Sequence, residues 1–151
     1  MLKSAFLFAC HTGLRKGDIE ALKWGDLPIV DGVRRLHIKT GKKNVVLNTK
    51  LNERALSILP TPARGDDDRV FLGFRYDGAR NAKLKYWMLK AGITKEDITS
   101  HTARHSFAVY KLSKGVPMYQ LSKLMAHDSS RTTERYYAQF DTDSLDRYAD
   151  M

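Results

Sequence analysis

Residues 101–140, HTARHSFAVYKLSKGVPMYQLSKLMAHDSSRTTERYYAQF, decide the fold of the C-terminal third of this chain. Ser100 or Thr99 directly precedes the stretch, and either hydroxyl can cap the first turn of a helix. Gly115 is placed to end that helix, because glycine readily adopts the left-handed conformation found after a helix C-terminus. The pattern therefore predicts a helix over roughly 101–114.

A second helix is expected directly after the first. Pro117 suits the first turn of a helix, and apolar residues then recur at helical spacing to about Ala126. A further short helix is expected over 130–138. Leu145 and Tyr148 mark a last amphipathic piece in an acidic tail.

The upstream part of the chain combines helices with a small sheet. Helical patterns are expected over 2–11, 15–24, 51–59 and 79–91. Between the second and third of these, residues 34–39 and 43–48 alternate apolar and polar side chains, which predicts a β-hairpin with one buried face. Residues 70–72 are expected to add a short third strand. The predicted fold class is α+β, mainly α, with a small three-stranded antiparallel sheet.

Composition restricts the function classes. The 151 residues suit one domain, and the sequence has no apolar run of membrane length. A single cysteine, Cys10, excludes an internal disulfide and fits a reducing compartment. The formal net charge of +9 indicates a polyanionic partner. Part of this charge is concentrated in the predicted hairpin, which carries five basic residues: Arg34, Arg35, Lys39, Lys42 and Lys43.

Four side chains have the chemistry needed around a reacting phosphate. His101 and Arg104 are three positions apart, so both project from one helix face. The planar guanidinium of Arg104 suits two phosphate oxygens, and an imidazole moves protons near neutral pH. Arg15 follows the tight turn Thr12-Gly13, which would direct it toward a pocket. His127 is the second imidazole of the set.

A tyrosine beside such cations can act as a nucleophile, because the positive charge favours the phenolate. Tyr136 and Tyr137 are adjacent, so their chemistry alone does not choose between them. The pair His101 and His105 also invites a metal interpretation. HTARH lacks the glutamate of HExxH, and Arg104 would lie beside the dication, so we expect no metal. His105 is instead expected to pack between helices.

Three boxes, HTGLRKGD at 11–18, HTARHSFAV at 101–109 and LMAHDSSRTTERYY at 124–137, resemble the signature boxes of the tyrosine recombinases, also called phage-type integrases. The resemblance covers about 5–137. It implies the catalytic domain of a tyrosine recombinase over 1–151, with 141–151 a C-terminal tail. The N-terminal core-binding domain of the family precedes the catalytic domain and is absent from this sequence, so we expect weak DNA binding by this chain alone.

Carried over position by position, the resemblance assigns the catalytic residues. Arg15 matches the first arginine and Asp18 the acidic residue three positions later. His101 and Arg104 match the HxxR box, and His127 matches the histidine of the third box. Tyr136, nine residues after His127, matches the nucleophile and is favoured over Tyr137. A hairpin lysine completes the set; Lys39 fits it, with Lys42 and Lys43 as rivals. Arg34, Arg35, Lys42 and Lys43 are expected to bind DNA.

The sequence departs from the family pattern at Ala126, where glycine usually precedes the histidine. We expect the methyl group to be tolerated, although it could tighten the turn.

The implied reaction is site-specific recombination of double-stranded DNA through a 3′-phosphotyrosyl link, without cofactor or metal. The family works as a tetramer on two duplexes, and the acidic tail resembles the segment that docks on a neighbouring subunit. We expect no membrane association and a cytoplasmic, nucleoid-associated protein of a bacterium or phage. The alternatives are a DNA-binding module that has lost catalysis and relaxation of DNA like that of a type IB topoisomerase.

Overall fold

The computed structural model of the chain describes residues 1–40, 45–62, 65–95 and 97–127, together with Arg131, Thr133, Glu134 and Tyr137. The elements follow one another as helix α1 (Leu2–Thr12), helix α2 (Lys16–Ala21), the 3₁₀ helix η1 (Trp24–Asp26), strands β1 (Ile29–Val30), β2 (Val33–Thr40) and β3 (Val45–Lys50), and helices α3 (Glu53–Ile58), α4 (Gly78–Lys90), α5 (Ser100–Ser113) and α6 (Met118–Leu124). The expected α+β architecture, mainly α, is confirmed.

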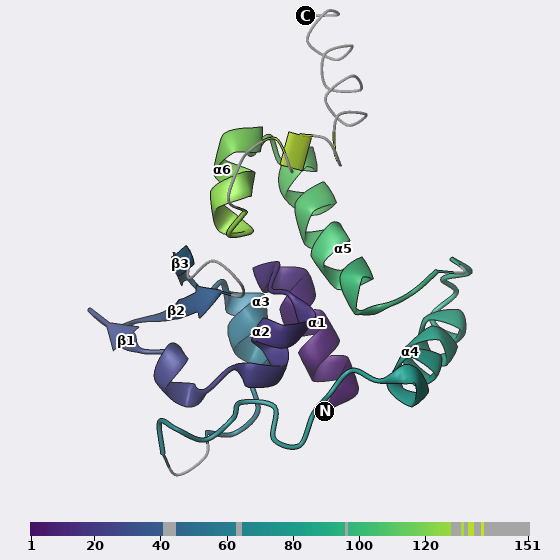
Figure 1. Cartoon of the computed structure of the whole chain (residues 1–151), viewed down its shortest axis with the longest axis horizontal. Coiled ribbons are helices and arrows are strands. Elements are labelled where there is room, and N and C mark those ends of the chain that lie inside the picture. The colour runs from purple at the N-terminus through teal and green to yellow at the C-terminus, as the bar shows by residue number, and fades with distance from the viewer. Residues whose placement is uncertain are drawn as a thin grey trace, which may run out of the picture.

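Helix α1 is the centre of the fold, and α5, α3 and α4 all contact it (Figure 1). Its residues Ala5, Phe6, Phe8 and Ala9 are buried in the main hydrophobic core. Such a helix, apolar on several sides, is stable only when neighbours cover it. The first sequence box, 11–18, begins in the last two residues of α1 and continues into α2, and the second box lies on α5, so the contact of α1 with α5 brings the two boxes near each other.

The sheet has the order β1-β2-β3, and both pairs are antiparallel. The alternation predicted for the hairpin is confirmed: Leu36, Ile38 and Leu47 are buried, whereas His37 and Lys39 on the opposite face are exposed. Ile38 pairs with Leu47 and Lys39 with Val46. The period of two along β2 therefore places Lys39 on the solvent side of the sheet.

Helices α5 and α6 carry a second, smaller core. It consists of Phe107, Ala108, Leu121, Met125 and Tyr137, with partly buried apolar neighbours. Thr99 is the residue that caps α5, since its side chain accepts a hydrogen bond from the backbone of the first turn. The predicted apolar stripe of α6 faces this cluster. The ends of α5 and α6 are thereby fixed against the segment that follows them.

Two expectations about the elements were wrong. Residues 70–72 form a turn, not a strand; Val70 and Phe71 are buried there in the main core. The third strand is instead β1, with Ile29 61% exposed and Val30 47% exposed. The helix expected over 15–24 ends at Ala21, and the chain then continues into η1.

Gly13, which follows α1, is required by its conformation and its neighbours. Its φ is 71°, in the left-handed region, and an added Cβ would lie 2.6 Å from Phe107 Cδ1. We expect Gly13→Ala to cost about 2–4 kcal/mol of unfolding free energy, from backbone strain plus overpacking. Gly115 is the matched control, because its φ is 78° but nothing lies within 4 Å of an added Cβ.

Gly115→Ala should therefore cost only the backbone part, about 1–2 kcal/mol. Chemical denaturation of the two variants measures both losses. Equal losses would contradict the role assigned to Phe107.

Candidate active site

Arg104 is the most constrained of the predicted catalytic residues. It lies on α5 and is only 7% exposed. One terminal nitrogen, Nη1, donates to the carbonyl of Gly13, and Nη2 donates to the carbonyl of Met125 over 2.7 Å. Two carbonyls from distant parts of the chain thus fix the plane of the guanidinium. A fixed fork is suited to a planar, bidentate acceptor such as two phosphate oxygens.

Arg15 is held by the same turn that holds Arg104. It is the residue preceding α2, is half-buried, and its Nη2 donates to the carbonyl of Ala126 over 3.3 Å. The carbonyls of Met125 and Ala126 therefore each accept a hydrogen bond from one arginine. Carbonyls at the end of a helix lack partners within it and carry its negative pole, so the end of α6 is a suitable anchor for two cations.

Ala126 occupies the position where the family usually has glycine, and the turn there tolerates its methyl group. Ala126 has φ 48° and is 3% exposed. The methyl group is accommodated in the left-handed conformation that glycine adopts more readily.

The site has an excess of positive charge. Burial and, to a smaller extent, the nearby charge of Arg15 lower the pKa of Arg104 to about 10, while Asp18 and Tyr137 act in the opposite direction. Arg104 stays protonated at neutral pH, but two guanidiniums lie close together in a partly dehydrated place. An anion bound between them would relieve this repulsion.

Asp18 has a buried carboxylate oxygen, Oδ2, that finds no hydrogen-bond partner among the described residues. Its charge acts on Arg104. Asp18 therefore lies near enough to Arg104 for its negative charge to favour the protonated guanidinium.

His127 follows directly on the turn that binds the arginines. Its backbone N–H donates to the carbonyl of Ser122 over 3.0 Å, and a hydrogen bond of 2.5 Å joins its Nδ1 to Oγ1 of Thr133. Thr133 is fully buried. The hydrogen bond to Thr133 therefore holds the imidazole ring, and the backbone directly before His127 binds the two arginines.

His101 is exposed in the first turn of α5, one turn before Arg104. His105 differs from its expectation. It was expected to pack between helices, but it is exposed, and its Nδ1 shares a hydrogen bond of 2.8 Å with the hydroxyl of Tyr137. His105 thus contacts Tyr137 in the C-terminal segment by its ring and by a hydrogen bond.

Lys39 lies on the wall of a cavity of about 360 Å³ that Asp18 also lines. Asp26 and His37 complete its polar lining. Strand β2 therefore presents Lys39 toward the helix that follows Arg15. This placement supports Lys39 as a member of the site; its rivals Lys42 and Lys43 lie outside the described residues.

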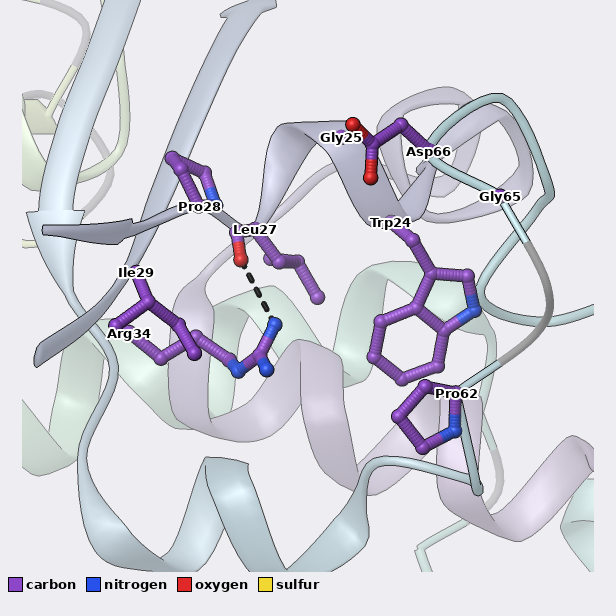
Figure 2. A pocket seen from close by; sticks show the side chains of 9 residues that line it. All are labelled: Trp24, Gly25, Leu27, Pro28, Ile29, Arg34, Pro62, Gly65 and Asp66. Carbon is purple, nitrogen blue, oxygen red and sulfur yellow. Dashed lines mark hydrogen bonds between the residues drawn. The ribbon is translucent and has the colours of Figure 1, made fainter. Parts of the chain in front are cut away.

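A larger cavity, of about 440 Å³, lies on the other side of the η1 turn, and Figure 2 shows its lining. Arg34 points into it and donates from Nη1 to the carbonyl of Leu27 over 2.8 Å, with its guanidinium 5.9 Å from the Trp24 ring. Arg35 is bonded to the side chain of Asn48 over 2.8 Å. Both arginines are thus engaged within the protein, and their contact with DNA stays a prediction.

The remaining predicted residue, Tyr136, also lies outside the described residues. The structure thus brings together Arg15, Arg104 and His127 around the end of α6, and places Lys39 beside Asp18.

The contacts that order the site were not found from the sequence. Backbone carbonyls of Gly13, Met125 and Ala126 have no sequence signature of their own. Thr133 offered one signal, since a threonine six residues after a candidate histidine can hydrogen-bond to it. That signal is too common to be used alone.

Arg15 and Arg104 are thus bound to successive backbone carbonyls directly before His127, on a mainly helical domain with a small antiparallel sheet. The family model described as "Phage integrase family" matches residues 1–143. The chain belongs to the phage integrase family.

Curated relatives agree with this assignment. The chain is 31% identical over 137 residues to "Tyrosine recombinase XerC" of Roseiflexus sp. strain RS-1, covering 83% of this chain and 43% of the relative. It is 29% identical over 150 residues to the integrase of Salmonella phage P22, covering 89% of this chain and 38% of the relative. The chain thus spans less than half the length of these two relatives.

Solved structures share the fold. The XerH site-specific recombinase in a pre-cleavage complex with difH substrate has a TM-score of 0.71 and 22% identity, over 89% of this chain and 42% of that one. The catalytic domain of bacteriophage HP1 integrase has a TM-score of 0.65 and 20% identity, over 91% of this chain and 73% of that one. No helix in the described ranges is long and apolar enough to cross a membrane.

Proposed function

We propose that this chain cuts and rejoins double-stranded DNA at specific sites, through a covalent link between a DNA 3′-phosphate and Tyr136. One observation carries the proposal: Arg15 and Arg104 are bound to the successive carbonyls of Ala126 and Met125, with His127 next in the chain. Membership of the phage integrase family supports it, as does the DNA in the complexes of the XerH recombinase and the Tn1549 transposon integrase.

In the first step the Tyr136 oxygen attacks the phosphorus of a phosphodiester. A bond forms between this oxygen and phosphorus, and the bond to the 5′ oxygen of the next nucleotide breaks. Arg15, Arg104 and His127 stabilise the negative charge on the non-bridging oxygens, because their donors are already oriented before the reaction.

Lys39 gives its proton to the departing 5′ oxygen, which leaves as a hydroxyl, and His101 assists by accepting the phenolic proton of Tyr136. A 5′-hydroxyl from another strand then attacks the phosphotyrosyl link and reverses the step. Because the link keeps the energy of the broken bond, the reaction needs no ATP and no metal. The strand therefore changes partner without net hydrolysis.

A nicked DNA library tests the proposal. The library carries randomised sequence on both sides of the nick. When cleavage occurs close to the nick, the short 5′-hydroxyl fragment diffuses away and the adduct is trapped. The chain is incubated with the library in excess EDTA, and covalent adducts that survive detergent are isolated and sequenced. We expect adducts enriched in one sequence.

Each other outcome has a definite meaning. Retarded DNA without adducts would identify a binding module instead of an enzyme. Adducts without sequence enrichment, together with relaxation of supercoiled plasmid, would identify topoisomerase-like activity. Adducts that vanish with EDTA and return with zinc or magnesium would overturn the metal-free mechanism.

The affinity of the chain for duplex DNA is expected to depend steeply on salt, because neutralised phosphates release counterions. With about five phosphate contacts, raising the salt from about 50 to 200 mM should weaken binding on the order of 10²-fold or more. Removing one contact by Arg35→Ala should reduce the logarithmic slope by about 0.9. Fluorescence anisotropy over a salt series measures this slope.

Lys23→Ala is the matched control for the salt series. Lys23 is already paired with Asp67 at 2.8 Å, so its removal should leave the slope unchanged. A flat salt response of the unmodified chain would contradict an electrostatic DNA interface.

The acidic tail, 141–151, lies outside the described residues. We propose from its amphipathic pattern and from the family resemblance that it docks on a neighbouring subunit, so that four copies assemble on two duplexes. Deleting the tail should leave adduct formation on nicked DNA but abolish the tetrameric DNA complex in sedimentation.

A further inference from the structure

Tyr137 is a buried tyrosine whose hydroxyl is hydrogen-bonded. It is 4% exposed and packs in the smaller core with Phe107, Leu121 and Met125. Its hydroxyl and Nδ1 of His105 are 2.8 Å apart, and the two rings meet edge to face with centroids 5.9 Å apart. A buried tyrosine hydroxyl generally needs such a partner, so this pair is a specific contact.

A second contact holds the same segment four residues earlier. Thr133 is fully buried, and its Oγ1 is bonded to Nδ1 of His127. Both Thr133 and Tyr137 have helical backbone, and positions four apart share one helix face. Arg131 and Glu134, by contrast, are exposed. The inward face of the segment is thus bonded to α5 at one point and to the residues after α6 at another.

These two contacts flank the assigned nucleophile in the sequence. Tyr136 directly precedes Tyr137, so its Cα is one peptide unit, about 3.8 Å, from an anchored residue. The charge of Tyr137 also acts on Arg104, which places the anchor close to the arginine pair. A shift of the anchor would therefore move the backbone that carries Tyr136 relative to the bound phosphate.

We propose that the His105–Tyr137 hydrogen bond is a positioning contact that sets where Tyr136 meets the phosphate. His105 and Tyr137 are positioning residues, not catalytic ones, because they act through the backbone of the segment. The catalytic consequence rests on the proposed function. The Tyr137 ring is buried in the smaller core and its hydroxyl is bonded to His105 on α5, so both ends of this side chain are held.

The anchor is first tested without any reaction. Hydrogen–deuterium exchange is measured on the peptide that contains 131–137 in the intact chain. Tyr137→Phe keeps the buried ring but removes the hydroxyl, and we expect exchange of this peptide to become about three- to tenfold faster, as for loss of one hydrogen bond. Tyr110→Phe is the matched control, since Tyr110 lies on α5 and is 50% exposed.

The partner residue provides a rescue. His105→Ala should accelerate exchange as Tyr137→Phe does, whereas His105→Asn, whose side-chain amide lies near the position of Nδ1, should restore slow exchange. The double variant Tyr137→Phe with His105→Ala should be no faster than His105→Ala alone, because His105→Ala already removes the hydrogen bond that Tyr137→Phe removes. Additive effects or unchanged exchange would overturn the anchor.

The catalytic consequence is tested by single-turnover adduct formation on the DNA recovered from the nicked library. We expect Tyr137→Phe to form adducts about three- to tenfold more slowly at unchanged DNA affinity, and to be equally slow when the leaving oxygen is replaced by sulfur. A merely structural role would leave the rate unchanged at saturating DNA, and that result would overturn the proposal. If the unmodified chain forms no adducts, that result contradicts the proposed function and, with it, the catalytic consequence. The hydrogen–deuterium exchange measurement decides separately whether the His105–Tyr137 contact holds the segment.

Discussion

Replacing Tyr136 with phenylalanine is expected to abolish covalent protein–DNA adducts. In the proposed mechanism the phenolic oxygen forms the bond to phosphorus, and no other group of the site replaces it. Loss of a nucleophile typically lowers the rate on the order of 10⁴-fold or more. Binding of duplex DNA should be unaffected, because the arginines and lysines that contact phosphate remain.

The neighbouring tyrosine provides the control. Tyr137→Phe should still accumulate adducts, because the Tyr137 hydroxyl is buried and bonded to His105. Adduct formation by both variants is followed on the nicked DNA by denaturing gel. If Tyr137→Phe abolishes the adduct and Tyr136→Phe leaves it, the nine-residue register from His127 is wrong.

The helices were largely predictable because their apolar residues recur at the helical period and their caps are local. The helix expected over 101–114 is α5, Ser100–Ser113. The helix expected over 15–24 was wrong at its end for a tertiary reason. Trp24 N–H donates to the carbonyl of Asp68, and Val70 N–H donates to that of Leu22, so pairing with a distant loop replaces the last helical turn.

The sheet was predicted where one face is buried and missed where both are exposed. Strand β1 has two exposed residues, Ile29 and Val30, and its only signal is pairing with β2. Val70 and Phe71 are buried in a turn, so their apolar side chains indicate burial in the core and not a β-strand. Hydrophobicity alone therefore did not distinguish the two.

The signature boxes name the side chains of the proposed site but not the contacts that hold them. The orientation of these side chains was not predictable, because it depends on carbonyls at the end of α6 and on Gly13. The left-handed turn at Ala126 is the least predictable part, since alanine gives no signal for a positive φ. The arrangement of Arg15 and Arg104 is thus a property of the backbone that the boxes do not encode.

Lys39→Ala is expected to slow cleavage of normal DNA and to be largely rescued when sulfur replaces the 5′-bridging oxygen. An alkoxide has a high proton affinity, so its departure needs a positioned acid, and general acid catalysis typically contributes about 10²–10⁴-fold. A thiolate leaves without that proton. Lys39 is exposed on β2 and lines the same cavity as Asp18, and in the proposed mechanism it supplies this proton.

Arg104→Ala gives the contrasting result. Its guanidinium, bound by the carbonyls of Gly13 and Met125, stabilises charge on the non-bridging oxygens, which the sulfur does not change. We therefore expect a loss of about 10²–10³-fold or more on both substrates, as for removal of an oxyanion donor. Single-turnover rates on the paired substrates separate the two roles. If Lys42→Ala or Lys43→Ala shows the rescue and Lys39→Ala does not, the acid lies beyond the end of β2, and the assignment of Lys39 is wrong.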